Sequence, residues 1–239
     1  MKLTDFRVLT FDCYGTLIDW ESGIFTALRP LLDTRSHAIN RDEALETFAR
    51  HESAQQAETP AMVYSELLVE VHRRLAREWG VGVDEDMHQR FGASVPGWPA
   101  FPDSAGALAY LQQHYKLVIL SNVDRASFAG SNARLGVAFD AIYTAQDIGS
   151  YKPSPLNFEY MLARLGELGH AKDDVLHTAQ SLFHDHEPAK TFGLASAWID
   201  RRHHQQGFGA TMPPGRGAEY DFRFPSLAAM AEAHAREMA

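Results

Sequence analysis

RVLTFDCYGTL, the stretch from Arg7 to Leu17, carries the clearest structural signal in this sequence. It begins with a short apolar run rich in β-branched and aromatic residues, which is typical of a buried strand. Asp12 lies where this run ends, and Gly15 permits a tight turn directly after it. Because parallel sheets collect their chemistry at the carboxyl ends of the strands, Asp12 is the first candidate site residue.

Four later apolar runs have the same character, and helical patterns separate most of them. The runs span Lys116–Asn122, Phe139–Ala145, Val175–Gln180 and Ala195–Asp200, and the helical patterns span Ala105–His114, Pro155–Leu165 and Glu187–Phe192. Strands that alternate with helices predict an α/β fold in which helices cover both faces of a parallel sheet. The residues that follow each run are therefore the next candidates.

The stretch from Ile18 to Pro102 breaks this alternation, because its apolar residues follow a helical period. We predict an α/β core made of residues 1–17 and 102–239, with a helical insertion at residues 18–101. One inserted helix carries an apolar stripe formed by Tyr64, Leu68 and Val71. The stripe is interpreted either as packing within the insertion or as the face of a homodimer.

Composition limits the classes of function. The 239 residues carry a formal charge of −9, which argues against a nucleic-acid partner. Cys13 is the only cysteine, so an intrachain disulfide is impossible. The first residues lack a signal-peptide pattern, and no apolar run approaches the ~20 residues that a bilayer span needs. We therefore expect a cytoplasmic protein without a membrane partner.

Polar side chains follow four of the predicted strands. Asp12 ends the first, Ser121 and Asn122 end the second, Lys152 follows the third, and Asp185 follows the fourth after a short gap. Each of these residues alone is common in turns and helix caps. Together, and in this order, they predict a site at the carboxyl edge of the sheet.

In this order the segments FDCYGTL, LSN, YKPSP and HDHEPAKTFG resemble the four motifs of the haloacid dehalogenase (HAD) superfamily. The resemblance spans nearly the whole chain. It implies a hydrolase with a Rossmann-like core and an inserted helical cap, in which Asp12 is a covalent nucleophile. It also implies that Ser121 hydrogen-bonds in the second motif, that Lys152 holds charge beside Asp12, and that Asp185 orients Lys152 and helps to activate water. A carboxylate suits this role, since it is ionised at neutral pH and forms an ester that water can hydrolyse.

Tyr14 separates two activities within this superfamily. The phosphatases carry an aspartate at that position as a general acid, and a phenol with a pKa of ~10 is a poor replacement. A halide leaving group needs no proton, and FDCYGTL resembles the first motif of the type II (S)-2-haloacid dehalogenases. The resemblance implies attack on a small 2-halocarboxylate, which gives the (R)-2-hydroxy acid and halide without metal or cofactor. A Mg²⁺-dependent phosphatase is the alternative, with Asp185 and Glu187 as an acidic pair.

The same resemblance assigns the binding of the small carboxylate substrate. Asn122 and backbone amides near Tyr14 and Thr16 would receive the substrate carboxylate. The family also has a cap-helix arginine that grips substrate and halide, and helix context points to Arg50 for that role.

The fourth motif departs from the dehalogenase pattern. Gln180 replaces a serine and Leu182 replaces an asparagine, whereas Ser181 and Asp185 are retained. These positions normally hold water and polar substrate groups. Their change motivates an alternative in which Asp12 attacks a different activated carbon, such as a strained ring that opens with the help of a proton donor. A non-catalytic binding domain is the remaining alternative.

Histidines flank the fourth-motif aspartate. His184 and His186 sit on either side of Asp185, and alternation directs at most one of them into the site. We therefore expect no metal site here, and we keep His184, like Gln180, as a candidate substrate-binding residue.

Overall fold

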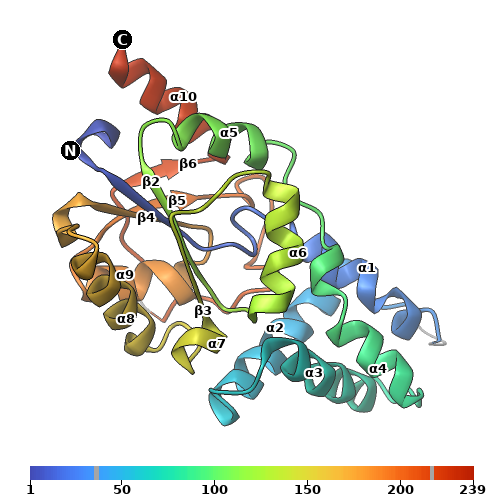
Figure 1. The fold of residues 1–239 in the computed structure, drawn as a ribbon. Coiled ribbons are helices and arrows are strands. Elements are labelled where there is room, and N and C mark those ends of the chain that lie inside the picture. The colour runs from blue at the N-terminus through green and yellow to red at the C-terminus, as the bar shows by residue number, and fades with distance from the viewer. Residues whose placement is uncertain (35–37, 216–217) are drawn as a thin grey trace.

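The computed structural model describes residues 1–34, 38–215 and 218–239. Across these residues, parallel strands form one six-stranded sheet in the order β3-β2-β1-β4-β5-β6 (Figure 1). The strands are β1 (Val8–Phe11), β2 (Lys116–Ser121), β3 (Ala141–Thr144), β4 (Val175–Ala179), β5 (Ala195–Ile199) and β6 (Phe222–Phe224). The α/β fold predicted from the sequence is confirmed, and the short edge strand β6 is an addition to it.

Strand β1 lies in the middle of the sheet. Phe11, its last residue, pairs with Ile119 of β2 on one side and with Thr178 of β4 on the other. All four residues of β1 are buried, which explains its continuous apolar pattern. Asp12 follows directly, so it lies at the centre of the carboxyl edge.

Helices cover both faces of the sheet. Leu9 and Phe11 belong to the larger hydrophobic cluster, together with residues of α5 (Ser104–Leu111), α6 (Arg125–Leu135) and α10 (Leu227–Met238). Val8 faces the opposite way and belongs to a second cluster with α8 (Pro155–Glu167) and α9 (Glu187–Thr191). Because side chains alternate along each strand, they contribute to two separate hydrophobic layers, one on each face of the sheet.

In the described part of the segment between β1 and β2, α5 is preceded by four other α-helices, which lie together at the end of the molecule away from the termini (Figure 1). They are α1 (Trp20–Leu32), α2 (Arg41–Glu58), α3 (Tyr64–Glu78) and α4 (Glu85–Gly92). The apolar stripe of Tyr64, Leu68 and Val71 is buried in the same cluster as the sheet residues. It therefore packs inside the chain, while the homodimer and the exact division into core and cap stay predictions.

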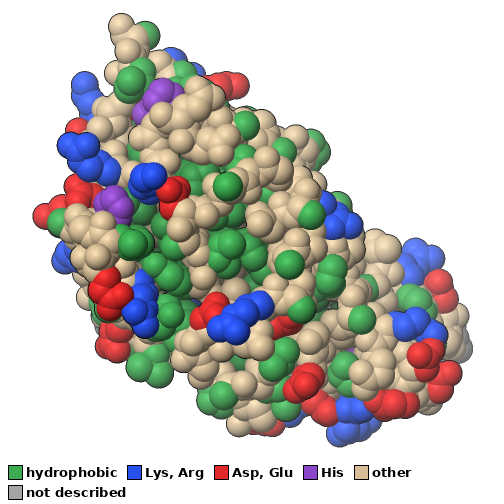
Figure 2. Space-filling model, in the orientation of Figure 1, with side chains coloured by type: hydrophobic (Ala, Val, Ile, Leu, Met, Phe, Trp, Pro, Cys, Tyr) green, Lys and Arg blue, Asp and Glu red, His purple; other side chains and the backbone are tan. Residues whose placement is uncertain are grey.

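Basic and acidic side chains are intermixed over the face seen in Figure 2. No helix in the described ranges is both long and apolar enough to cross a membrane.

Candidate active site

A buried lysine joins two carboxylates at the carboxyl edge of the sheet. The Nζ atom of Lys152 lies 3.0 Å from Asp12 Oδ1 and 2.6 Å from Asp185 Oδ1. It also donates to the main-chain oxygen of Leu120 at 2.9 Å. These three bonds use all three N–H groups of the ammonium. Burial lowers the pKa of Lys152, but the two carboxylates outweigh burial and raise it overall, so the lysine stays charged.

Asn122 fixes the loop that carries this lysine. Its Nδ2 donates to the main-chain oxygen of Lys152 at 2.9 Å, and its Oδ1 accepts from the main-chain nitrogen of Lys152 at 2.7 Å. Asn122 borders the cavity above Asp12, yet both ends of its amide are engaged. The structure thus gives Asn122 a positioning contact that the sequence did not suggest.

A line of buried side chains supports Asp185 from inside the sheet. His177 on β4 places Nε2 2.9 Å from Asp185 Oδ1, and its Nδ1 lies 2.8 Å from Oγ1 of Thr10 on β1. Burial raises the pKa of Asp185, but Lys152 and His177 outweigh burial and hold this pKa well below its ordinary value. Asp185 is therefore anionic and acts as the fixed counter-charge of the lysine.

Asp12 is held through both of its carboxylate oxygens. Thr16 donates from Oγ1 to Asp12 Oδ2 at 2.9 Å, while Lys152 binds Oδ1. The hydroxyl of Thr16 in turn accepts from the main-chain nitrogen of Gln180 at 2.9 Å. Burial raises the pKa of Asp12, and Lys152 opposes that shift. Gly15, with φ of +93°, makes the turn between Asp12 and Thr16 possible.

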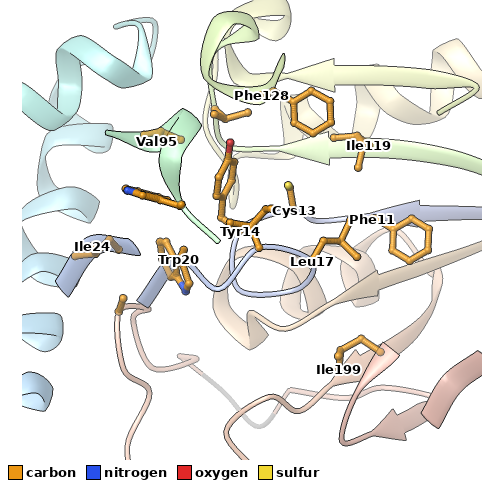
Figure 3. Close-up of a cluster of buried hydrophobic side chains, with 14 of the residues drawn as sticks. Phe11, Cys13, Tyr14, Leu17, Trp20, Ile24, Val95, Ile119, Phe128 and Ile199 are labelled. Carbon is orange, nitrogen blue, oxygen red and sulfur yellow. The ribbon is translucent and has the colours of Figure 1, made fainter. Parts of the chain in front are cut away.

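The hydroxyl of Tyr14 is directed at helix α6 rather than at Asp12. It is hydrogen-bonded to Ser131 Oγ at 2.9 Å, and the ring packs edge-on against Trp98. Figure 3 shows the ring directed toward Phe128, with its hydroxyl far from the turn. Burial also raises the pKa of Tyr14 well above its ordinary value. Tyr14 borders the cavity with its ring and is not placed as a proton donor there.

A small cavity of about 30 Å³ lies above Asp12. Its floor comes from the sheet edge, and its roof comes from the inserted helices. The roof residues are Trp20 of α1, Glu52 and Gln56 of α2, and Tyr64 of α3. The hydroxyl of Ser121 lines the floor, is buried, and has no hydrogen-bond partner in the described part of the chain.

The fourth motif forms a single π-helical turn, η4 (Leu182–His186), a feature often found at functional sites. His184 lines the cavity, with Nδ1 3.2 Å from Ser181 Oγ, and burial lowers its pKa to about 4. The Nε2 atom of His184 has no hydrogen-bond partner among the described residues. His186 turns instead toward Ser196 and the main-chain oxygen of Ala179, so only one histidine of this pair reaches the cavity.

The model of the haloacid dehalogenase-like hydrolase family matches residues 6–177. This chain belongs to that family.

Relatives of this HAD-like hydrolase include dehalogenases and a protein of different description. This chain is 25% identical over 206 residues to an (S)-2-haloacid dehalogenase of Pseudomonas putida, and the alignment covers 81% of this chain and 84% of the relative. The L-2-haloacid dehalogenase of Xanthobacter autotrophicus, solved with chloropropionic acid covalently bound, superposes with a TM-score of 0.75 at 22% identity, over 98% of this chain and 100% of the other. A putative HAD-hydrolase of Bacillus subtilis, solved bound to magnesium, gives a TM-score of 0.74 at 18% identity, over 96% and 99%. The structural likenesses establish the shared fold.

Arg50 does not reach the site of this HAD-like hydrolase. Its guanidinium pairs with Glu78 at 2.6 Å on the surface, and its side chain is 53% exposed. Two positions along a helix rotate a side chain by ~200°, so Glu52 points inward where Arg50 points outward. The expected cap arginine is therefore absent from the described cavity lining, and an acidic residue stands in this helix instead.

Gln180 likewise lies outside the cavity above Asp12. Its side chain lines a neighbouring surface pocket with Arg201 and Arg202, and its main chain holds Thr16. Sequence reasoning missed Glu52, Gln56 and His177 as site residues. The only signal for them was a polar side chain on the buried face of a helix or strand, and the sequence did not show which face is buried.

The acidic residues are not arranged as a cation cage. No three His, Cys, Asp or Glu side chains of the described ranges are grouped as metal ligands. Asp12 and Asp185 each direct Oδ1 at the ammonium of Lys152, which occupies the space between them. The metal-free reaction stays a prediction.

Proposed function

We propose that this HAD-like hydrolase attacks an activated carbon of a small carboxylate through Asp12, and that (S)-2-haloacids are its substrates. The observation that carries the proposal is the Asp12–Lys152–Asp185 arrangement. Lys152 favours the ionised form of Asp12, and Asp185 keeps Lys152 in place.

In the first step an oxygen of Asp12 attacks the α-carbon of the substrate. The carbon–halogen bond breaks and its electron pair leaves with the halide, so no proton is transferred. This suits a site in which the hydroxyl of Tyr14 is bound to Ser131. The product of this step is an ester between Asp12 and the substrate carbon.

In the second step water attacks the carbonyl carbon of the Asp12 ester. The ester C–O bond breaks, the 2-hydroxy acid leaves, and Asp12 regains its carboxylate. His184 is the candidate base, since it lines the cavity and its pKa of about 4 keeps it neutral at physiological pH. It takes one proton from the attacking water and returns it to the departing alkoxide oxygen, and the other proton of the water is released to solvent as the Asp12 carboxyl ionises. Inversion at the α-carbon makes the product the (R)-2-hydroxy acid.

The direct test is chloride release from (S)-2-chloropropionate by the wild type and by Asp12→Asn. We expect turnover by the wild type and a loss of about 10⁴-fold or more in the variant. A single turnover in H₂¹⁸O should place the label in the Asp12 peptide, as mass spectrometry would detect. Absence of chloride release and of labelled Asp12 would contradict the proposal.

The magnesium-bound relative motivates a control. Phosphate esters should not be hydrolysed, and chloride release should be insensitive to EDTA. EDTA-sensitive phosphate release would contradict the proposed dehalogenase activity and indicate a phosphatase.

A further inference from the structure

The cavity has no free cation for a substrate carboxylate. Lys152 is the only Lys or Arg among the described residues that line it, and its three N–H groups are already bound. Asp12 and Asp185 oppose that single ammonium, which leaves one negative charge around the cavity. A carboxylate substrate therefore needs a neutral hydrogen-bond donor in the cavity wall, because a further ionised carboxylate there would repel it.

Glu52 lies in the roof of this cavity, where a substrate group opposite Asp12 would meet it. Its side chain is buried, and Tyr64 donates from its hydroxyl to Glu52 Oε1 at 2.5 Å. That bond leaves Oε2 as the oxygen able to carry a proton. Burial raises the pKa of Glu52 to about 7, although the hydrogen bond from Tyr64 lowers it. A carboxylic acid is thus available at neutral pH and below.

Apart from Asp12, the ionisable groups around Glu52 keep their charge near neutral pH. Burial raises the pKa values of Tyr64 and Tyr151 well above their ordinary value, so both phenols are neutral. His184 is neutral because burial lowers its pKa to about 4. Across the cavity Lys152 stays protonated, Asp185 stays anionic, and Asp12 remains paired with the lysine. Burial also raises the pKa of Asp12, so Asp12 is the other lining group that can gain a proton, and the Glu52 variants described below distinguish the two.

We propose that Glu52, held by Tyr64, binds the substrate carboxylate as a neutral acid, donating one hydrogen bond in the role expected of a cap arginine. This inference rests on the proposed small-carboxylate substrate. Ionisation of Glu52 would set a second negative charge against the ligand and remove the donor. Binding above neutral pH must therefore be accompanied by uptake of a proton.

Propionate tests this role without any reaction, because it has a carboxylate and no leaving group. Isothermal titration calorimetry from about pH 6 to about pH 9 should show a constant Kd below the pKa of Glu52 and a tenfold rise per pH unit above it. Titrations in two buffers of different ionisation enthalpy should show proton uptake approaching one per propionate at the upper end. A Kd independent of pH would overturn the proposal, and so would an absence of propionate binding at every pH.

Three variants isolate the group responsible. Glu52→Gln keeps an N–H donor without a titrating proton, so its Kd should stay flat across the range. Tyr64→Phe removes a bond that lowers the pKa of Glu52, so the rise in Kd should begin at higher pH. Glu46→Gln, an exposed change on the same helix, should match the wild type. A wild-type profile that survives in Glu52→Gln would assign the titration to another group and sink the inference.

The two proposals can fail separately. If propionate binds as described but no haloacid releases halide, the donor role of Glu52 stands and the dehalogenase does not. If halide is released while propionate binding ignores pH, the dehalogenase stands and the role of Glu52 is wrong.

Discussion

The ammonium of Lys152 opposes two buried carboxylates, and among the described residues no other Lys or Arg lies within bonding distance of either. Removal of one partner from such a group leaves charge in the interior without compensation. Asp12 and Asp185 would then take up protons at higher pH, which also removes the nucleophilic form of Asp12.

We therefore expect Lys152→Met to abolish turnover and to lower the free energy of unfolding by about 3–5 kcal/mol, measured by urea denaturation at neutral pH. Lys116→Met is the matched control, since Lys116 pairs with Asp140 at the surface with 59% of its side chain exposed. Its cost should stay below about 1 kcal/mol. Equal losses in the two variants would mean that the buried lysine does not hold the site together.

Tyr14 offers a second test at the residue scale. Its hydroxyl bonds to Ser131, so Tyr14→Phe removes a buried hydrogen bond but no reacting group. We expect unfolding to become easier by about 1 kcal/mol, with kcat changed by less than about tenfold. A pH–rate profile that loses a limb in the variant would reveal a proton transfer by Tyr14 and contradict this assignment.

At the scale of single elements, helix α2 shows how a rotation decides which residue serves the site. Arg50 and Glu52 are neighbours in sequence but lie on opposite faces of the helix. Strand ends could be predicted, because parallel strands bring their carboxyl ends to one edge whatever their rotation. The inward face of α2 could not, because its buried residues include Glu52, Gln55 and Gln56 beside its apolar ones.

We expect Arg50→Gln to change kcat/KM by less than about twofold, and the free energy of unfolding by at most about 1 kcal/mol, because its ion pair with Glu78 is exposed. Steady-state kinetics and urea denaturation measure both quantities. A collapse of activity would show that α2 turns Arg50 toward the substrate during the reaction.

Helix α6 and strand β6 are among the elements that the sequence analysis did not predict. Helix α6 buries Ser127 and Ser131 as well as Phe128 and Leu135, so its sequence lacks an apolar stripe. Strand β6 has only three residues and lies at the sheet edge, too short for an alternating pattern to stand out. Neither of them provides a side chain that lines the cavity above Asp12.

At the scale of the whole molecule, the cavity above Asp12 lies between the sheet edge and the inserted helices. The sequence predicted both the parallel sheet and the inserted helices. Because the insertion follows the first strand directly, it also predicted that the helices lie at the carboxyl edge of the sheet. The size and polarity of the space depend on how the two layers meet, which no local pattern encodes. The cavity of about 30 Å³ has room for about one water molecule, so the roof must move to admit any substrate, and the smallest substrates require the least movement.

We expect kcat/KM to fall by about 10-fold or more for each methylene added beyond 2-chloropropionate, because a longer chain requires a larger movement of the roof. Chloride release from 2-chlorobutyrate and 2-chlorovalerate provides the measurement. Equal values across the series would mean that the helices open freely and that the closed cavity does not select substrates.

Thr10 lies in the middle of the sheet, completely buried, where a valine would fill the same space. Its hydroxyl nevertheless begins a path through His177 and Asp185 to the lysine beside the nucleophile. The relative position of β1 and β4 therefore affects the position of Lys152 and, through it, the carboxylate of Asp12. A replacement of Thr10 by valine, which packing would tolerate, therefore interrupts this path and is expected to lower activity although it lies far from any ligand.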